Sequence, residues 1–92
     1  IVKDLQTELV RQFVQEQLEP MLHAAGTADL LATMEALLSG DSFQVIADRL
    51  HVHKQTIVFR KKKIEDILHI DLDDPATRMN LSIAMKLLSV MD

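Results

Sequence analysis

Six of the ten lysine and arginine residues in this 92-residue chain lie within fifteen consecutive positions, 49–63. None of the fourteen aspartate and glutamate residues lies there, so the segment is basic in a chain whose formal net charge is -4. A block of like charge repels itself unless an anion compensates it, which indicates a surface for a polyanion such as nucleic acid. The alternative is that the run Arg60–Lys63 is only a solvated helix face.

The basic segment overlaps a pattern of two helices joined by a tight turn. The sequence predicts a helix from Ser42 to about Leu50, a turn at His51–His53 and a second helix from Lys54 to about Leu68. Asp41, three residues before Gln44, has the spacing of a capping box variant and is expected to cap the first helix. Helix, tight turn and helix in this order are typical of a helix-turn-helix.

Apolar residues in these two helices have the spacing that a helix-turn-helix requires. Ala47 is small where the helices are expected to cross closest, and Ile57 and Ile64 are expected to face the core. The contacts that would fix the crossing angle come from Ile46, Leu50, Val52 and Ile57. The side chains that then point outward from the second helix are Gln55, Phe59, Lys62 and Asp66, with Thr56, Val58 and Lys63 beside them.

The outward side chains suit the major groove of DNA. Gln55 can pair with the edge of adenine, Thr56 can contact a base or a phosphate, and Phe59 can touch a thymine methyl group. Lys62 and Lys63 would reach phosphates and so set affinity and salt dependence. The alternative for Phe59 is packing beneath a neighbouring helix.

Composition bounds the fold and several classes of function. Two glycines, two prolines and three aromatic residues in 92 positions favour one small all-α domain of several helices. There is no cysteine and no apolar run long enough to span a membrane, which favours a cytoplasmic protein without a membrane partner. Since the chain begins at Ile1, we expect the region that senses an effector to lie outside it.

Helical spacing continues before the helix-turn-helix. A first helix is expected to end near Glu19, and Pro20 would then begin a brief segment, Met21–Ala25. Gly26 and Thr27 would break the chain and cap a further helix, which ends at Ser39–Gly40. We therefore divide the chain into an N-terminal helical segment, 1–26, and a helix-turn-helix domain, 27–92.

The first and last helices carry more apolar surface than one core contact needs. The apolar residues of the first are Val2, Leu5, Leu9, Val10, Phe13, Val14 and Leu18. Those of the last, which Asp74 and Pro75 would begin, are Met79, Leu81, Ile83, Ala84, Leu87, Leu88, Val90 and Met91. We expect a homodimer through one or both of these helices. A helical protein-interaction module that does not bind DNA is the alternative function.

Other chemistries lack their residue patterns. His51 and His53 are close in sequence, but no cysteine and no paired helix spacing accompanies them, so we expect no metal or cofactor. His53 is expected to cap the second helix or to meet a phosphate. The run Asp71, Asp73 and Asp74 lacks the glycine and the glutamate of a calcium loop. No phosphate loop or nucleophile elbow is present, so we do not expect an enzyme.

The chain resembles, at these residues, the carboxy-terminal DNA-binding domain of PucR-type transcription regulators, which are related to the sugar-diacid regulator CdaR. The family's recognition segment reads His-Val-His-Arg-Asn-Thr-Leu-Arg-Tyr-Arg-Leu, and residues 51–61 match it at five positions and conservatively at four. Residues 70–75, followed by Arg78 and Leu81, look like the family's Leu-Asp-Leu-Asp-Asp-Pro connector and the start of its last helix. The resemblance covers roughly 30–88.

This resemblance implies an all-helical domain of a bacterial regulator that binds double-stranded DNA as a dimer or larger assembly. It places DNA contacts at Lys54, Gln55, Thr56 and Arg60. Gln55 stands where the family has Asn, Val58 where it has Arg, and Lys61 where it has an inward Leu. Val58 lacks the bidentate donor that Arg would offer to guanine or phosphate. Lys61 would have to extend its stem past the core to solvent.

Overall fold

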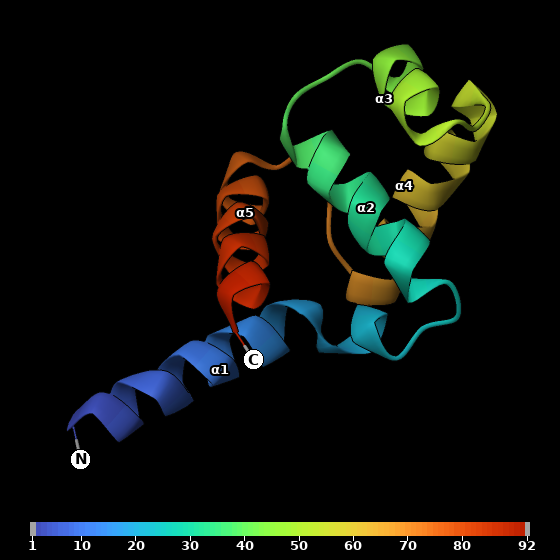
Figure 1. The fold of residues 1–92 in the computed structure, drawn as a ribbon. Helices are drawn as coiled ribbons and strands as arrows, with labels where there is room; N and C mark the ends of the chain where they lie inside the picture. The colour runs from blue at the N-terminus through green and yellow to red at the C-terminus, as the bar shows by residue number, and fades with distance from the viewer. Residues whose placement is uncertain (1, 92) are drawn as a thin grey trace.

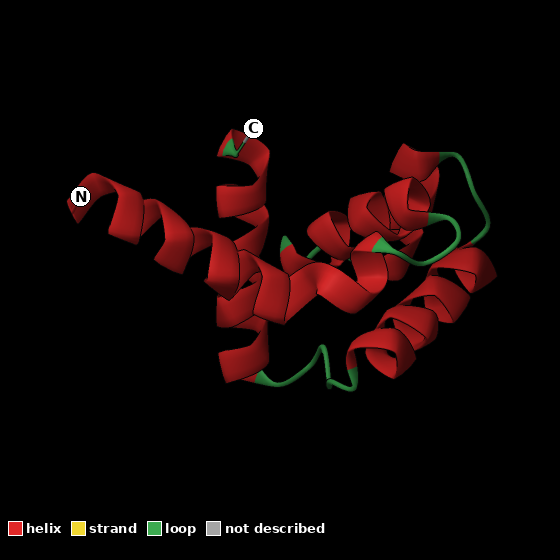
Figure 2. Ribbon diagram, turned by 90° about the horizontal axis from the view of Figure 1, so that it is seen from below, coloured by secondary structure: helices red, strands yellow, loops and turns green. Residues whose placement is uncertain are grey.

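This computed structural model describes residues 2–91, which contain five α-helices and the turns that join them (Figure 1). They are α1 Val2–Leu22, α2 Thr27–Leu38, α3 Phe43–Leu50, α4 Lys54–Leu68 and α5 Pro75–Val90. Figure 2 shows these helices joined by short loops without a strand in the described range, so the expected all-α class is confirmed. Ile1 and Asp92, the outer ends of the two predicted segments, lie outside the described residues, as do the side chains of Val2 and Lys3.

The helix α1 extends beyond the rest of the domain at its N-terminal end (Figure 1). Its C-terminal part packs against α5, α4 and α2, and Leu18 and Met21 are fully buried there. The helix continues through Pro20 to Leu22, so the predicted end near Glu19 and the separate segment after it are wrong. Proline removes one backbone hydrogen bond, but the burial of Met21 depends on that last turn remaining helical.

Two predicted helix caps are also wrong. Thr27 begins α2, but its hydroxyl donates to the carbonyl of Met21 at the end of α1, at 3.1 Å, and does not cap α2. The cap of α3 is Ser42 and not Asp41: the Ser42 hydroxyl oxygen accepts from the Val45 N–H at 3.2 Å. Serine and aspartate are both good cap residues, so their neighbouring positions could not be distinguished by propensity.

Other helix boundaries follow the local chemistry of the sequence. Gly40, with φ 89°, follows the end of α2, as expected of a residue that tolerates the left-handed region. Asp74 precedes α5 and accepts from the Thr77 N–H at 2.9 Å, with Pro75 at the first helical position. This backbone hydrogen bond and the Thr77 hydroxyl lower the pKa of the Asp74 carboxyl.

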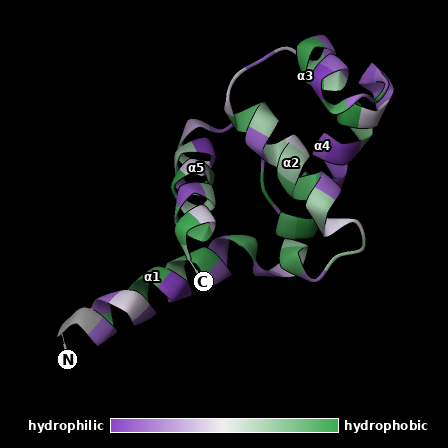
Figure 3. Cartoon of the chain, viewed as in Figure 1, coloured by the Kyte–Doolittle hydropathy of each residue, from purple (hydrophilic) through white to green (hydrophobic). Residues whose placement is uncertain are grey.

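One hydrophobic core joins the helices. Its fully buried side chains include Leu18, Met21, Met34, Ile46, Ala47, Ile57, Ile64, Leu72 and Ala84. Figure 3 shows apolar segments on α2 and α5 and strongly polar segments on α4. The core beneath the polar helix α4 is therefore supplied largely by the neighbouring helices. None of the helices in residues 2–91 combines the length and the apolar character needed to cross a lipid bilayer.

Candidate nucleic-acid interface

The helices α3 and α4 pack against each other and are joined by a three-residue turn, as predicted. His51 has the left-handed conformation, with φ 59°. The Val52 N–H donates to the carbonyl of Ala47 at 3.0 Å, and the His51 N–H donates to Asp48 at 3.4 Å. These two bonds form a Schellman motif, which ends α3 and redirects the chain into α4. The backbone therefore fixes the turn without help from the imidazole of His51.

His53 immediately precedes α4 and is exposed. Its carbonyl accepts from the Thr56 N–H at 2.9 Å, but its side chain makes no capping hydrogen bond. His53 therefore occupies the N-cap position, as expected, but its imidazole does not take part in the cap. The contact of His53 with a phosphate stays a prediction. Lys54 and Gln55, the first two residues of α4, are exposed, and Thr56 is half-buried.

The outer face of α4 lies opposite the fully buried Ile57 and Ile64. Gln55 and Lys62 are exposed on it, and Phe59 is 66% exposed. The alternative that Phe59 packs beneath a neighbouring helix is therefore wrong. Val58, which was expected beside the outward side chains but not among the DNA contacts, is 39% exposed beside this face. Its helical spacing from Gln55 was the signal that could have added it to the candidate residues.

Carboxylates pair with four of the six side chains in the basic segment. The pairs are Arg49–Asp41 at 2.6 Å, Arg60–Asp29 at 3.8 Å, Lys61–Asp73 at 3.0 Å and Lys62–Asp66 at 3.2 Å. Within the described chain, Lys54 and Lys63 have no ion pair or side-chain hydrogen bond. Exposed ion pairs contribute about 0–1 kcal/mol, so the pair with Asp66 holds Lys62, whose side chain is 73% exposed, only weakly.

Arg60 turns away from the outer face and toward α2. Its side chain is 18% exposed and lies 3.8 Å from Asp29. It also donates to the hydroxyl of the fully buried Thr33 at 3.2 Å. Arg60 therefore ties α4 to α2. The DNA contact that the family resemblance implies for Arg60 stays a prediction, and it would require this side chain to leave its partners.

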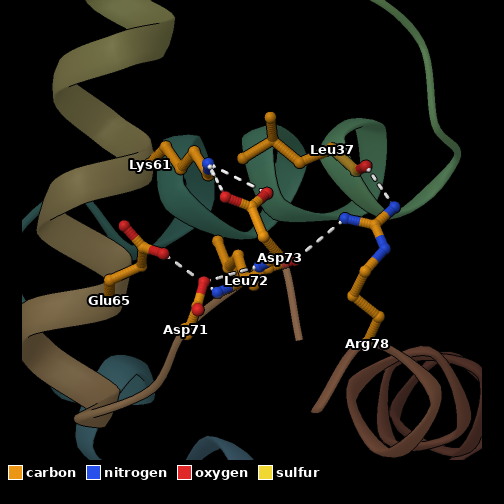
Figure 4. Close-up of polar contacts among 7 residues, drawn as sticks. All are labelled: Leu37, Lys61, Glu65, Asp71, Leu72, Asp73 and Arg78. Atoms are coloured by element: carbon orange, nitrogen blue, oxygen red, sulfur yellow. Dashed lines mark hydrogen bonds and ion pairs between the residues drawn. The ribbon is translucent and has the colours of Figure 1, made fainter. Parts of the chain in front are cut away.

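Lys61 is 20% exposed, and its ammonium group ends on the carboxylate of Asp73 (Figure 4). The same ammonium lies 5.7 Å above the ring of Phe43 on α3. The free-energy cost of burying most of the Lys61 side chain, where the family has leucine, is thus offset by the carboxylate of Asp73 and the ring of Phe43. The stem of Lys61 thus extends past the core, as expected, but its ammonium group ends on the exposed carboxylate of Asp73 in the connector and not in open solvent.

That connector holds two further contacts that the sequence did not reveal (Figure 4). Glu65 of α4 accepts from the Leu72 N–H at 2.9 Å. Arg78 of α5 donates to the carbonyls of Leu72 and Leu37, each at 3.0 Å. Across residues 2–91, no three histidine or acidic side chains are grouped to hold a metal ion. The acidic connector instead positions α4 and α5.

Comparisons with known proteins agree with this geometry. The sequence profile of one family, described as the PucR C-terminal helix-turn-helix domain, matches residues 30–87. A purine catabolism regulatory protein of Bacillus subtilis (strain 168) is 42% identical over 41 residues. This match covers 45% of the present chain and 8% of that relative, so the chain spans a small part of the relative's length. No solved structure matches the chain.

Proposed function

This chain belongs to the family of PucR C-terminal helix-turn-helix domains, and we propose that it binds double-stranded DNA sequence-specifically as part of a PucR-like transcription regulator. The observation that carries the proposal is the outer face of α4. It is the second helix of the helix-turn-helix, and it presents exposed Gln55, Phe59 and Lys62 away from the core. The second helix of such a pair is the one that enters the major groove.

The side chains on α4 divide by the part of DNA that they would contact. Gln55, Thr56 and Phe59 lie in the N-terminal half of the helix, which meets base edges in helix-turn-helix complexes. Lys62 and Lys63 lie one turn further on, where they would meet phosphates. Lys54 and His53, at the start of the helix, would meet the sugar-phosphate backbone on the opposite side of the major groove.

The remaining assignments follow from this role. A DNA-binding domain of a regulator needs no catalytic group, and we propose none for this chain. Its place would be the bacterial cytoplasm, where the DNA is. Because the chain matches only 8% of the Bacillus subtilis relative, we assign effector recognition to a region outside these 92 residues. The alternative function, an interaction module without DNA binding, gains no support from the comparisons.

We further propose that the domain pairs with a second copy. Exposed large apolar side chains lie on α1 and α5, at Leu5, Leu9, Met79, Ile83 and Val90. A symmetric pair through these helices would present two α4 helices to two half-sites about one turn of DNA apart. Sedimentation equilibrium with and without duplex tests this, and a monomer under both conditions at every concentration would contradict it.

The DNA-binding proposal predicts a steep salt dependence that the α4 lysines control. Binding to a mixed-sequence duplex is measured by fluorescence anisotropy across a salt titration, for the wild type and for Lys62→Ala/Lys63→Ala. Each lost phosphate contact reduces the slope of log K against log salt concentration by about 0.9. We expect the variant to lose about one to two units of slope.

The matched control is Lys86→Ala, which removes an exposed lysine from α5. We expect its slope to equal that of the wild type. Arg60→Ala tests the contact that the resemblance implies. An unchanged slope would show that the guanidinium stays on α2, and a slope reduced by about 0.9 would show that it moves to a phosphate. Absence of wild-type binding at low salt would refute the proposal and return attention to protein partners.

A further inference from the structure

Four side chains form a diamond on the outer face of α4. Gln55 precedes Val58 and Phe59 by three and four residues, and Lys62 follows them by four and three. Residues at these spacings are neighbours on a helix surface. Val58 and Phe59 are 39% and 66% exposed, so two adjacent apolar groups lie between an amide and an ammonium group. A single exposed apolar residue is ordinary, but this pair lies at the centre of the face proposed to enter the groove.

Charge complementarity assigns this face to DNA and not to an apolar protein surface. Lys54 and Lys63 flank the diamond without a carboxylate partner in the described residues. Burying both ammonium groups against an apolar partner would leave them uncompensated, which is strongly unfavourable. Phosphates on either side of a groove compensate them while the apolar pair contacts the base edges.

The same face lacks an arginine able to read guanine. Arginine is the side chain that most often recognises guanine, through two hydrogen bonds to O6 and N7. Arg60 is directed to Thr33 and Asp29 on α2. Arg49 lies on α3 and donates to the carboxylate of Asp41 at 2.6 Å, a hydrogen bond that lowers the pKa of Asp41. The Thr56 hydroxyl can contact either type of base pair, and Lys62 is assigned to a phosphate. The groups left to distinguish base pairs are therefore one amide and two hydrocarbon side chains.

These groups match one type of base pair. In the major groove only thymine presents a methyl group, and adenine presents the N7 and N6 pair that a glutamine amide satisfies. We propose that the base pairs facing Gln55, Val58 and Phe59 are A·T pairs, with Gln55 on adenine and with Val58 and Phe59 on thymine methyl groups. This inference rests on the proposed DNA-binding function and specifies which half-site sequence the domain selects.

The test has two stages that separate this inference from the function on which it rests. The wild-type domain first selects ligands from a duplex library with a randomised core at low salt. Thymines of the selected half-site are then replaced by deoxyuridine, which removes the methyl group and keeps base pairing. Burying a group of this size changes affinity about fourfold, so we expect A·T-rich sites and about a fourfold loss for each contacted methyl.

Variants then assign the methyl groups to side chains. In Phe59→Ala and Val58→Ala, the ratio of thymine to deoxyuridine affinity at the corresponding position is expected to fall to about one. Both side chains are exposed, so folding should persist, and circular dichroism checks this. Val45→Ala on α3, 46% exposed in the wild type, is the control and should keep the wild-type ratio.

Each contrary result is informative. Selection of G·C pairs at these positions, or equal affinity of the wild type for thymine and deoxyuridine duplexes, overturns the inference while DNA binding stands. A methyl preference that persists in both Val58→Ala and Phe59→Ala also overturns it. Failure of the wild type to bind any library duplex refutes the proposed function and this inference together.

Discussion

Arg78→Met is expected to lower the free energy of unfolding by roughly 2–4 kcal/mol. The guanidinium donates to the carbonyl of Leu72 in the connector and to the carbonyls of Leu37 and Leu38 at the end of α2, at 3.0, 3.0 and 3.3 Å. A hydrogen bond that involves a charged group contributes about 1.5–3 kcal/mol. Arg78 is only half-buried, so water can replace some of the lost hydrogen bonds in the variant. The expected loss of stability is therefore smaller than the summed contribution of three such bonds.

Urea denaturation followed by circular dichroism measures the effect. Lys86→Met is the matched control, since it removes a positive charge from the same helix at an exposed position. We expect the control to change stability by less than about 0.5 kcal/mol. An Arg78→Met protein as stable as this control would show that the three carbonyls do not need the guanidinium, and that α5 is held by apolar contacts alone.

Ala47→Leu is expected to lower the free energy of unfolding by about 1–3 kcal/mol and to weaken DNA binding at the same time. Ala47 is fully buried on α3, next to the equally buried Ile46, and α3 packs against both α4 and α2. A larger side chain there cannot be accommodated in a close-packed interior without moving a helix. Displacement of α4 relative to α3 would misplace the recognition face.

Val45→Leu is the control for this substitution. It enlarges a side chain on the same helix, but Val45 is 46% exposed, so the added carbon can extend into solvent and neither stability nor binding should change much. Denaturation and anisotropy are measured on both variants. If Ala47→Leu keeps wild-type stability and affinity, then α3 and α4 do not meet as closely at Ala47 as the helix-turn-helix account requires.

The two helices of the helix-turn-helix were predictable because their signals are local. The apolar spacing of Ile57 and Ile64 gave the inward face of α4, and the Asp74–Pro75 pair gave the start of α5. Local signals failed where tertiary packing overrides them. Pro20 stays within α1 because the following turn is buried, and no pattern within that helix states what the turn will contact.

The sequence predicted where the candidate site lies, but not which of its basic side chains pair with carboxylates. Spacing alone turned Gln55 and Phe59 outward, and the structure leaves both exposed. The partners of Arg60 and Lys61 are Asp29 and Asp73, which lie on other elements and are brought close only by the fold. A net charge counted along the sequence therefore overestimates the positive charge available to a phosphate backbone.

The most direct test of the central claim, that α4 is the surface that meets DNA, is an NMR titration of the ¹⁵N-labelled domain with the selected duplex. Backbone amide shifts are expected to concentrate in residues 53–63, with smaller changes at the start of α3. The exposed outer face of α5 should remain unchanged at a fixed oligomeric state. Shifts confined to α5 or α1, with 53–63 unaffected by saturating duplex, would contradict the account.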